Sequence, residues 1–130
     1  MKRILFFLNI AFLSVFACQS QDKTNKIGSD AKHEVLSASD FKTKISNGDI
    51  QLVDVRTPKE FAAGSIENAL NINYLAEDFS ARIQSLDKNK PVYIFCLSGV
   101  RSGKAARVME GLGFSKVYDL KGGYSAWPKK

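Results

Sequence analysis

The segment of this sequence best suited to chemistry is a cysteine followed closely by a glycine, an arginine and a serine. It reads Cys96, Leu97, Ser98, Gly99, Val100, Arg101 and Ser102. A β-prone run precedes it and a helical pattern follows, so a loop that curls around the sulfur would aim its N–H groups and the free donors of the helix at one point. Such an anion cradle stabilises a thiolate or a bound oxyanion. Arg101 would add a permanent positive charge, and its planar guanidinium presents several N–H donors in an arrangement that suits an oxyanion.

The sequence offers no general base beside this thiol. His33 is the one histidine and lies in or before the first predicted strand, so a Cys–His protease or acyltransferase has almost no candidate base. We therefore expect the loop and Arg101 to activate Cys96. A cysteine at a strand end can also be a packing residue, but its combination with Gly99, Arg101 and a capped helix favours a reactive thiol.

Strands and helices must alternate to position this segment. From about residue 33 onward, β-rich runs alternate with helical patterns, which is the signature of βαβ units around a parallel sheet. The predicted strands are 34–36, 50–55, 69–72, 91–95 and 117–120. The predicted helices begin near Ser37 or Ser39, Thr57, Leu75, Ser102 and Gly123. We expect an α/β fold in which helices flank both faces of a central parallel sheet of about five strands, with 91–95 near its centre.

Composition limits the function classes. With 130 residues, 45% hydrophobic and 25% charged, the chain is one globular domain plus a tail. Two cysteines and one histidine cannot build a disulfide framework or a Cys/His zinc cluster, so we expect no metal and no cofactor. The net charge of +6 comes from interspersed acidic and basic residues, which argues against nucleic acid as a partner. We expect a monomer.

The N-terminus has the features of an export signal. Basic residues at positions 2 and 3 precede the apolar run 4–17, which is shorter than the roughly 20 residues that cross a bilayer. Val15-Phe16-Ala17-Cys18 resembles a bacterial lipobox, which implies cleavage and lipidation of Cys18; ordinary signal-peptidase cleavage is the alternative. We expect a signal peptide over 1–17, a lipidated N-terminus and flexible tether over 18–32, a domain over 33–130, and a lipid-anchored protein in the periplasm or at the outer membrane.

The cysteine loop resembles that of rhodanese-family sulfurtransferases. Protein tyrosine phosphatases place five residues between the cysteine and the arginine, which makes a ring for phosphate, whereas four residues separate Cys96 from Arg101. Further pieces resemble the family in order along the chain: Asp54-Val55-Arg56, Glu60-Phe61, Gly64-x-Ile66, Ala69, Asn71-Ile72, and Gly122-Gly123 with Trp127. Ser65 stands where the family commonly has histidine.

The resemblance implies a rhodanese-like fold and a ping-pong sulfur transfer. The Cys96 thiolate would take a sulfane sulfur from thiosulfate or a similar donor, and the resulting persulfide would pass it to cyanide or a thiol. The residues implied to bind the substrate are Leu97, Ser98, Gly99, Val100, Arg101 and Ser102. Two alternatives remain open: a rhodanese-like module at the envelope that only carries sulfur or binds a partner, and a cysteine-dependent phosphatase or arsenate reductase.

The resemblance also places Asp54 and Arg56 near the floor of the pocket. For these two residues and Glu60 we predict a supporting role, namely a salt bridge that fixes the turn from strand to helix. Direct contact with the substrate is the alternative.

Overall fold

A single parallel sheet forms the centre of the computed structural model, which describes residues 32–129. The strands are β1 (His33–Leu36), β2 (Gln51–Asp54), β3 (Leu70–Asn71), β4 (Val92–Phe95) and β5 (Val117–Leu120). Their order across the sheet is β1-β5-β4-β2-β3, and all pairs are parallel. The predicted central parallel sheet of five strands is therefore confirmed, with β4 in the middle position. The predicted signal peptide, Cys18 and the tether up to residue 31 lie outside the described residues.

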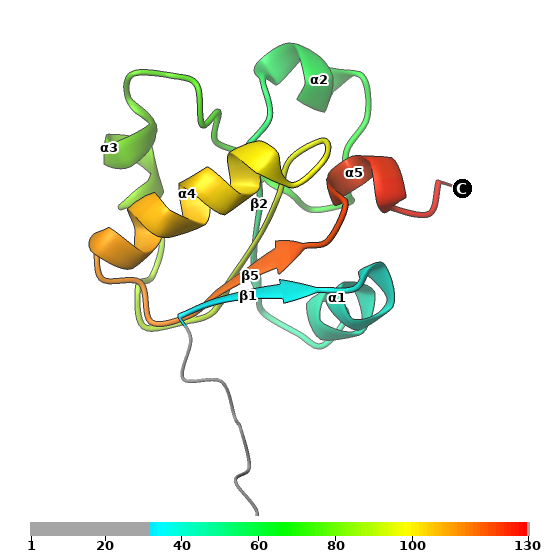
Figure 1. Cartoon of the computed structure of the whole chain (residues 1–130), viewed down its shortest axis with the longest axis horizontal. Helices are drawn as coiled ribbons and strands as arrows, with labels where there is room; N and C mark the ends of the chain where they lie inside the picture. The colour runs from blue at the N-terminus through cyan, green and yellow to red at the C-terminus, as the bar shows by residue number, and fades with distance from the viewer. Residues whose placement is uncertain (1–31, 130) are drawn as a thin grey trace, which may run out of the picture.

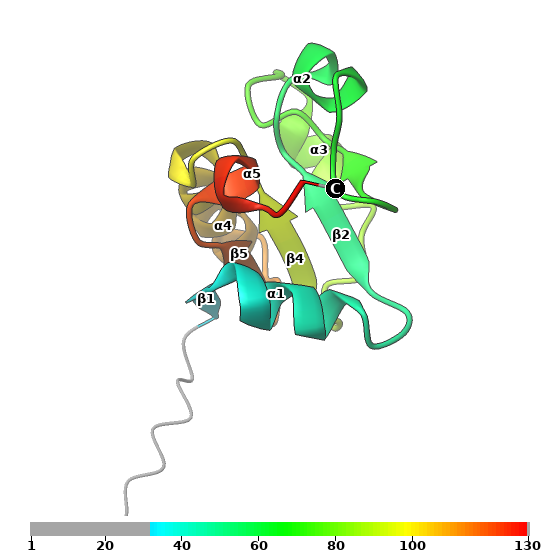
Figure 2. The ribbon, with the colours of Figure 1, turned by 90° about the vertical axis from the view of Figure 1, so that its right-hand side faces the viewer.

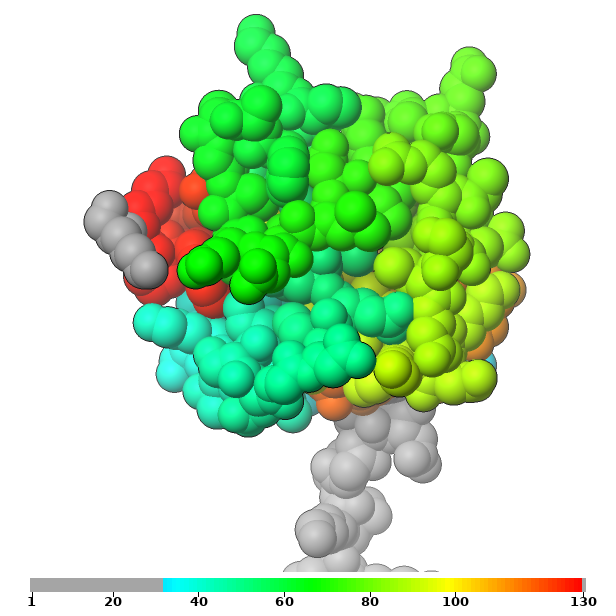
Figure 3. Space-filling view, turned by 180° about the vertical axis from the view of Figure 1, so that it is seen from behind, coloured from blue at the N-terminus to red at the C-terminus, as the bar shows by residue number. Residues whose placement is uncertain are grey.

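Helices cover both faces of the sheet, as predicted. They are α1 (Ala38–Ile45), α2 (Pro58–Ala62), α3 (Phe79–Ile83), α4 (Val100–Gly111) and α5 (Gly123–Ala126). The helices α3 and α4 lie on one face, and α1 and α5 lie on the other (Figures 1 and 2). Seen from behind, the surface consists mainly of the segments between α1 and β4, with α5 at one edge (Figure 3). Within residues 32–129, no helix has the length and apolar character needed to cross a membrane.

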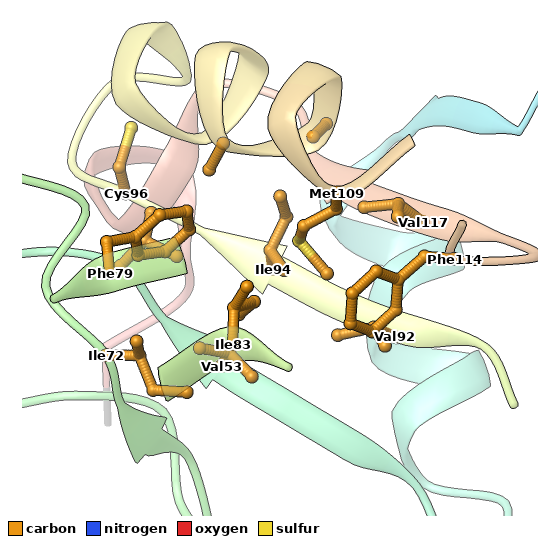
Figure 4. Packing of buried hydrophobic residues seen from close by; sticks show 13 residues of the cluster. Val53, Ile72, Phe79, Ile83, Val92, Ile94, Cys96, Met109, Phe114 and Val117 are labelled. Carbon is orange, nitrogen blue, oxygen red and sulfur yellow. The ribbon is translucent and has the colours of Figure 1, made fainter. Parts of the chain in front are cut away.

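Two apolar clusters form the core, one on each face of the sheet. On the α3 and α4 face, Ile83 and Met109 pack against β-strand residues such as Ile94, and Cys96 belongs to the same cluster (Figure 4). On the other face, Phe41 of α1 is fully buried and its ring lies edge-on to that of Trp127, with 6.1 Å between the ring centroids. Trp127 therefore packs against the core, as predicted.

Local sequence signals explain where α2 begins. The Thr57 hydroxyl accepts the Glu60 N–H, the Glu60 carboxylate accepts the Thr57 N–H, and Pro58 occupies the first helical position. This reciprocal arrangement satisfies backbone donors that a helix start leaves free. The predicted cap is confirmed, and it fixes the position of Glu60 at the end of the sheet where the cysteine loop lies.

Two helices differ from the prediction. The apolar stripe that starts at Leu75 predicts a long helix, but α3 spans only Phe79–Ile83. The Asn73 side chain accepts the Leu75 N–H, and this local turn competes with helix formation. In contrast, α4 begins at Val100, two residues earlier than predicted, because Gly99 (φ +103°) turns the chain directly into the helix.

Candidate active site

Cys96 lies immediately after β4 and points toward the start of α4 (Figure 4). Its side chain is 1% exposed. The Gly99 N–H donates to the Cys96 Sγ across 3.0 Å. Gly99 adopts a φ of +103°, which favours glycine and lets the chain bend tightly around the sulfur. The predicted cradle is therefore present at the carboxyl end of the central strand.

The surroundings of Cys96 favour its thiolate. Burial, the largest influence, would raise the pKa of the thiol, but the Ser102 hydroxyl and the N–H groups of Ser102, Gly99 and Ser98 together hold this pKa below its ordinary value. These donors belong to the loop and to the first turn of α4, whose N-terminus carries a partial positive charge. A charged sulfur at this point is a ready nucleophile.

Arg101 forms an ion pair that the sequence did not predict. Its guanidinium donates to both carboxylate oxygens of Glu60, with Nη1–Oε2 at 2.7 Å and Nη2–Oε1 at 2.9 Å. The hydrogen bond from Arg101 is the main reason that the pKa of Glu60 falls to about 2, with further lowering by Thr57 and opposition from burial. Arg101 thus joins α4 to α2. Its charge interacts with Cys96 through space, whereas the hydrogen-bond donors to Cys96 are those of Ser102 and the loop.

The predicted ion pair between Asp54 and Arg56 is present, without Glu60. It is buried, and the Arg56 Nη2 lies 2.8 Å from the Asp54 Oδ2. Arg56 also donates to the Gly64 carbonyl at 2.7 Å, and its guanidinium lies 4.3 Å from the centre of the Tyr124 ring. The Ser65 hydroxyl donates to the Asp54 Oδ2 at 2.8 Å. These contacts fix the turn after β2 against α5, which is a structural role.

The remaining loop residues divide between surface and interior. Leu97 and Val100 have exposed side chains, at 43% and 63%, and Ser98 is also exposed. Ser102, by contrast, is completely buried. A substrate arriving from solvent therefore meets two apolar side chains and a hydroxyl, while Ser102 acts from beneath the sulfur.

The C-terminal segment supports the cysteine loop, a feature that sequence reasoning missed. The Tyr124 N–H donates to the Cys96 carbonyl at 2.7 Å, and the Ser125 N–H donates to the Leu97 carbonyl at 3.0 Å. Gly123 has a φ of +61°, and a Cβ there would lie 2.5 Å from the backbone of Cys96 and Leu97. The adjacent glycines were the available signal, because two of them in a row indicate a close approach of backbones.

Asp119 is a second residue that the sequence did not reveal. It is 3% exposed in β5, and its Oδ2 lies 3.3 Å from the His33 Nε2. The run Val-Tyr-Asp-Leu at 117–120 predicts only a strand, because the partners of the Asp119 carboxylate come from other elements.

Known proteins resemble this chain in sequence. The family model described as "Rhodanese-like domain" matches residues 37–130. The Bacillus subtilis protein YqhL is 41% identical over 80 residues, which span 62% of this chain and 62% of YqhL. The protein named thiosulfate sulfurtransferase GlpE from Shewanella oneidensis is 37% identical over 78 residues, covering 60% of this chain and 75% of GlpE.

Solved structures agree with these sequence matches. The crystal structure of a rhodanese-like domain protein from Staphylococcus aureus is 33% identical, has a TM-score of 0.67, and covers 75% of this chain and 93% of its own. The order of strands, the cysteine loop after the central strand and these matches lead to one conclusion. The chain belongs to the rhodanese-like domain family.

Proposed function

We propose that this protein is a sulfurtransferase that carries a sulfane sulfur as a persulfide on Cys96. The observation that carries the proposal is the thiol itself, whose Sγ accepts the Gly99 N–H at 3.0 Å beside the N-terminus of α4 and whose pKa is lowered by the surrounding donors. The name of the related GlpE supports thiosulfate as a donor to test first.

The proposed reaction has two displacements at sulfur. The Cys96 thiolate attacks the outer sulfur of thiosulfate, a new S–S bond forms, and the bond to sulfite breaks with its electron pair leaving on sulfite. A thiolate or cyanide then attacks the outer sulfur of the persulfide, and the electron pair of the broken bond returns to Cys96. The loop N–H groups stabilise the negative sulfur in both steps.

Mass spectrometry after thiosulfate treatment tests this proposal. We expect one added sulfur atom on Cys96, its loss on addition of cyanide, and the appearance of thiocyanate. Cys96→Ser is the inactive variant, and Cys18→Ser is the matched control because it removes the other thiol of the chain. Sulfur transfer that survives in Cys96→Ser would contradict the proposal, whereas a stable persulfide without turnover on any small acceptor would identify a sulfur carrier.

Two features argue against a phosphatase or arsenate reductase. Four residues separate Cys96 from Arg101, one fewer than in the phosphatase loop. The Arg101 guanidinium, which would bind a phosphate, donates its hydrogen bonds to Glu60 instead. Hydrolysis of an aryl phosphate by the wild type but not by Cys96→Ser would overturn this conclusion.

We also propose that the chain is exported and held at the membrane by a lipid on Cys18, with residues 18–32 as a tether and 33–130 as the working domain. The basic start, the apolar run and the sequence that precedes Cys18 support this proposal. Incorporation of labelled palmitate into the wild type, and its absence from Cys18→Ala, is the expected result. Equal labelling of the two chains would refute it.

A further inference from the structure

A set of buried polar groups lies beneath the cysteine loop, and one of them, Asp119, has no part in the sulfur transfer described above. Asp119 of β5 stands opposite Ile94 of β4 in the parallel sheet, and Ile94 precedes Cys96 by two residues. Side chains two apart along a strand share a face of the sheet, so Cys96 and Asp119 both project toward α4. Ser102, in the first turn of α4, packs over this same face.

The hydrogen bonds of this group are incomplete. The Asp119 Oδ2 pairs with His33 at 3.3 Å, but the Asp119 Oδ1 and the Ser102 Oγ are both buried without a partner in hydrogen-bond geometry. Two neighbouring polar atoms in this condition are costly unless they can serve each other. A small rotation of the Ser102 hydroxyl supplies a donor to one neighbour at a time, since a hydroxyl has a single hydrogen to give.

The Ser102 hydroxyl acts on both neighbours. It lowers the pKa of the Cys96 thiol against the effect of burial. Burial raises the pKa of Asp119, and the Ser102 hydroxyl and His33 oppose that rise. The single hydrogen of the Ser102 hydroxyl can therefore be donated to Cys96 or to Asp119, and each of these groups accepts it most strongly when negatively charged.

We propose that Asp119 and Ser102 are positioning residues that set the charge of Cys96, because the Asp119 carboxylate and the Cys96 thiolate compete for the hydroxyl hydrogen of Ser102. When Asp119 is ionised, the Ser102 O–H donates to its Oδ1 and is lost to the sulfur. When Asp119 is protonated, its own O–H donates to the Ser102 Oγ, and the Ser102 O–H donates to the thiolate. Uptake of a proton by Asp119 thus helps Cys96 to remain charged as the pH falls.

The elements packed around Asp119 bring few other charges to it. β1 contributes His33, and β4 contributes the apolar Ile94. On α4, Arg101 is bound to Glu60, while Lys104 and Arg107 are exposed to solvent. His33 and Ser102 are accordingly the side chains whose hydrogen bonds or charge act on Asp119.

The inference rests on the proposed use of a Cys96 thiolate, but its test needs no sulfur donor. In the full chain carrying Cys18→Ser, the rate of alkylation by iodoacetamide is measured against pH for four forms: the parent, Asp119→Asn, Ser102→Ala and the double variant. Asparagine donates its amide N–H to the Ser102 Oγ and leaves the hydroxyl hydrogen for the sulfur. We expect Asp119→Asn to move the midpoint of alkylation to lower pH, which raises the rate below that midpoint by up to about tenfold.

The Ser102→Ala background identifies the hydroxyl as the link. Ser102→Ala should raise the midpoint more in the Asp119→Asn background than alone, because the hydroxyl serves the sulfur fully only when Asp119 does not take its hydrogen. Equivalently, Asp119→Asn should lose more than half of its effect when Ser102 is alanine. An unchanged midpoint in Asp119→Asn overturns the proposal, as does an equal shift in both backgrounds, which would indicate a direct charge effect.

A variant at half-buried His33 keeps the test decisive if Asp119→Asn does not fold. His33→Ala removes the group that helps to keep Asp119 ionised, so it should shift the midpoint in the same direction, and only when Ser102 is present. No shift in His33→Ala overturns the proposal. Alkylation shifts in a protein that forms no persulfide would instead refute the proposed sulfur transfer and leave this inference standing.

Discussion

Replacing Gly123 with alanine should damage the active site from outside it. The new Cβ would lie 2.5 Å from the Cys96 carbonyl oxygen and from the Leu97 carbonyl group, and ordinary contacts begin at 3.4 Å. The loop backbone must therefore withdraw by about 0.9 Å. Overpacking of this kind costs about 1–3 kcal/mol, and the left-handed φ of +61° adds about 1–2 kcal/mol for a residue with a Cβ.

Gly113→Ala is the matched control for backbone strain. Gly113 also has a positive φ, +92°, but nothing lies within 4 Å of a Cβ built there. Both variants place a Cβ on a left-handed backbone, so the difference between their unfolding free energies isolates the collision with the loop. We expect Gly123→Ala to be less stable than Gly113→Ala by about 1–3 kcal/mol, or about 4–8 °C in Tm per kcal/mol for a domain of this size.

The loop displacement should also appear at the thiol. A distortion of this size should lengthen and weaken the hydrogen bond from Gly99 to the Cys96 Sγ, now 3.0 Å long. The alkylation rate of Cys96 near neutral pH should then fall by about tenfold in Gly123→Ala and remain unchanged in Gly113→Ala. Equal stability and equal thiol reactivity of the two variants would refute the reasoning.

Three further predictions follow from the site. The pKa of Glu60 is about 2 in the folded chain and 4.5 ordinarily. Its ion pair with Arg101 therefore stabilises the fold fully above pH 4.5 and loses this effect as the pH falls toward 2. In urea unfolding, the difference in unfolding free energy between the wild type and Glu60→Gln should narrow over that range and not above it. Asp54→Asn leaves a buried guanidinium unpaired and should cost about 3–5 kcal/mol, against about 1.5 kcal/mol for Ser65→Ala, both measured by urea unfolding. The Cys96 pKa lies below its ordinary 9.0, so alkylation of the folded chain should reach its midpoint at a lower pH than alkylation in urea, and coincident midpoints would contradict the assigned cradle.

Local patterns account for what the sequence could predict. Each strand and most helix starts depend on neighbouring residues, as at the Thr57 cap, and the cradle depends on Gly99 standing three residues after Cys96. The length of α3 could not be predicted, because one hydrogen bond from Leu75 to the side chain of Asn73 outweighs the apolar periodicity.

Contacts across the fold account for what the sequence could not predict. Glu60 and Arg101 are 41 residues apart, and their pairing depends on where α2 lies relative to α4. The surroundings of Asp119 come from β1 and α4, so no window of sequence around it contains its partners. The site is predictable where one segment builds it, and unpredictable where several elements meet.

The position of β5 between β1 and β4 affects how the chain folds during synthesis. Among residues 32–129, β5 is the one strand that pairs with β1, and the carbonyls of Cys96 and Leu97 accept hydrogen bonds from the N–H groups of Tyr124 and Ser125. Because a ribosome releases the chain from its N-terminus onward, the sheet and the loop can close only when β5, Tyr124 and Ser125 have emerged. The thiol therefore acquires its full surroundings only after residues 117–125 have left the ribosome, and a chain truncated before β5 should carry Cys96 as a more ordinary cysteine.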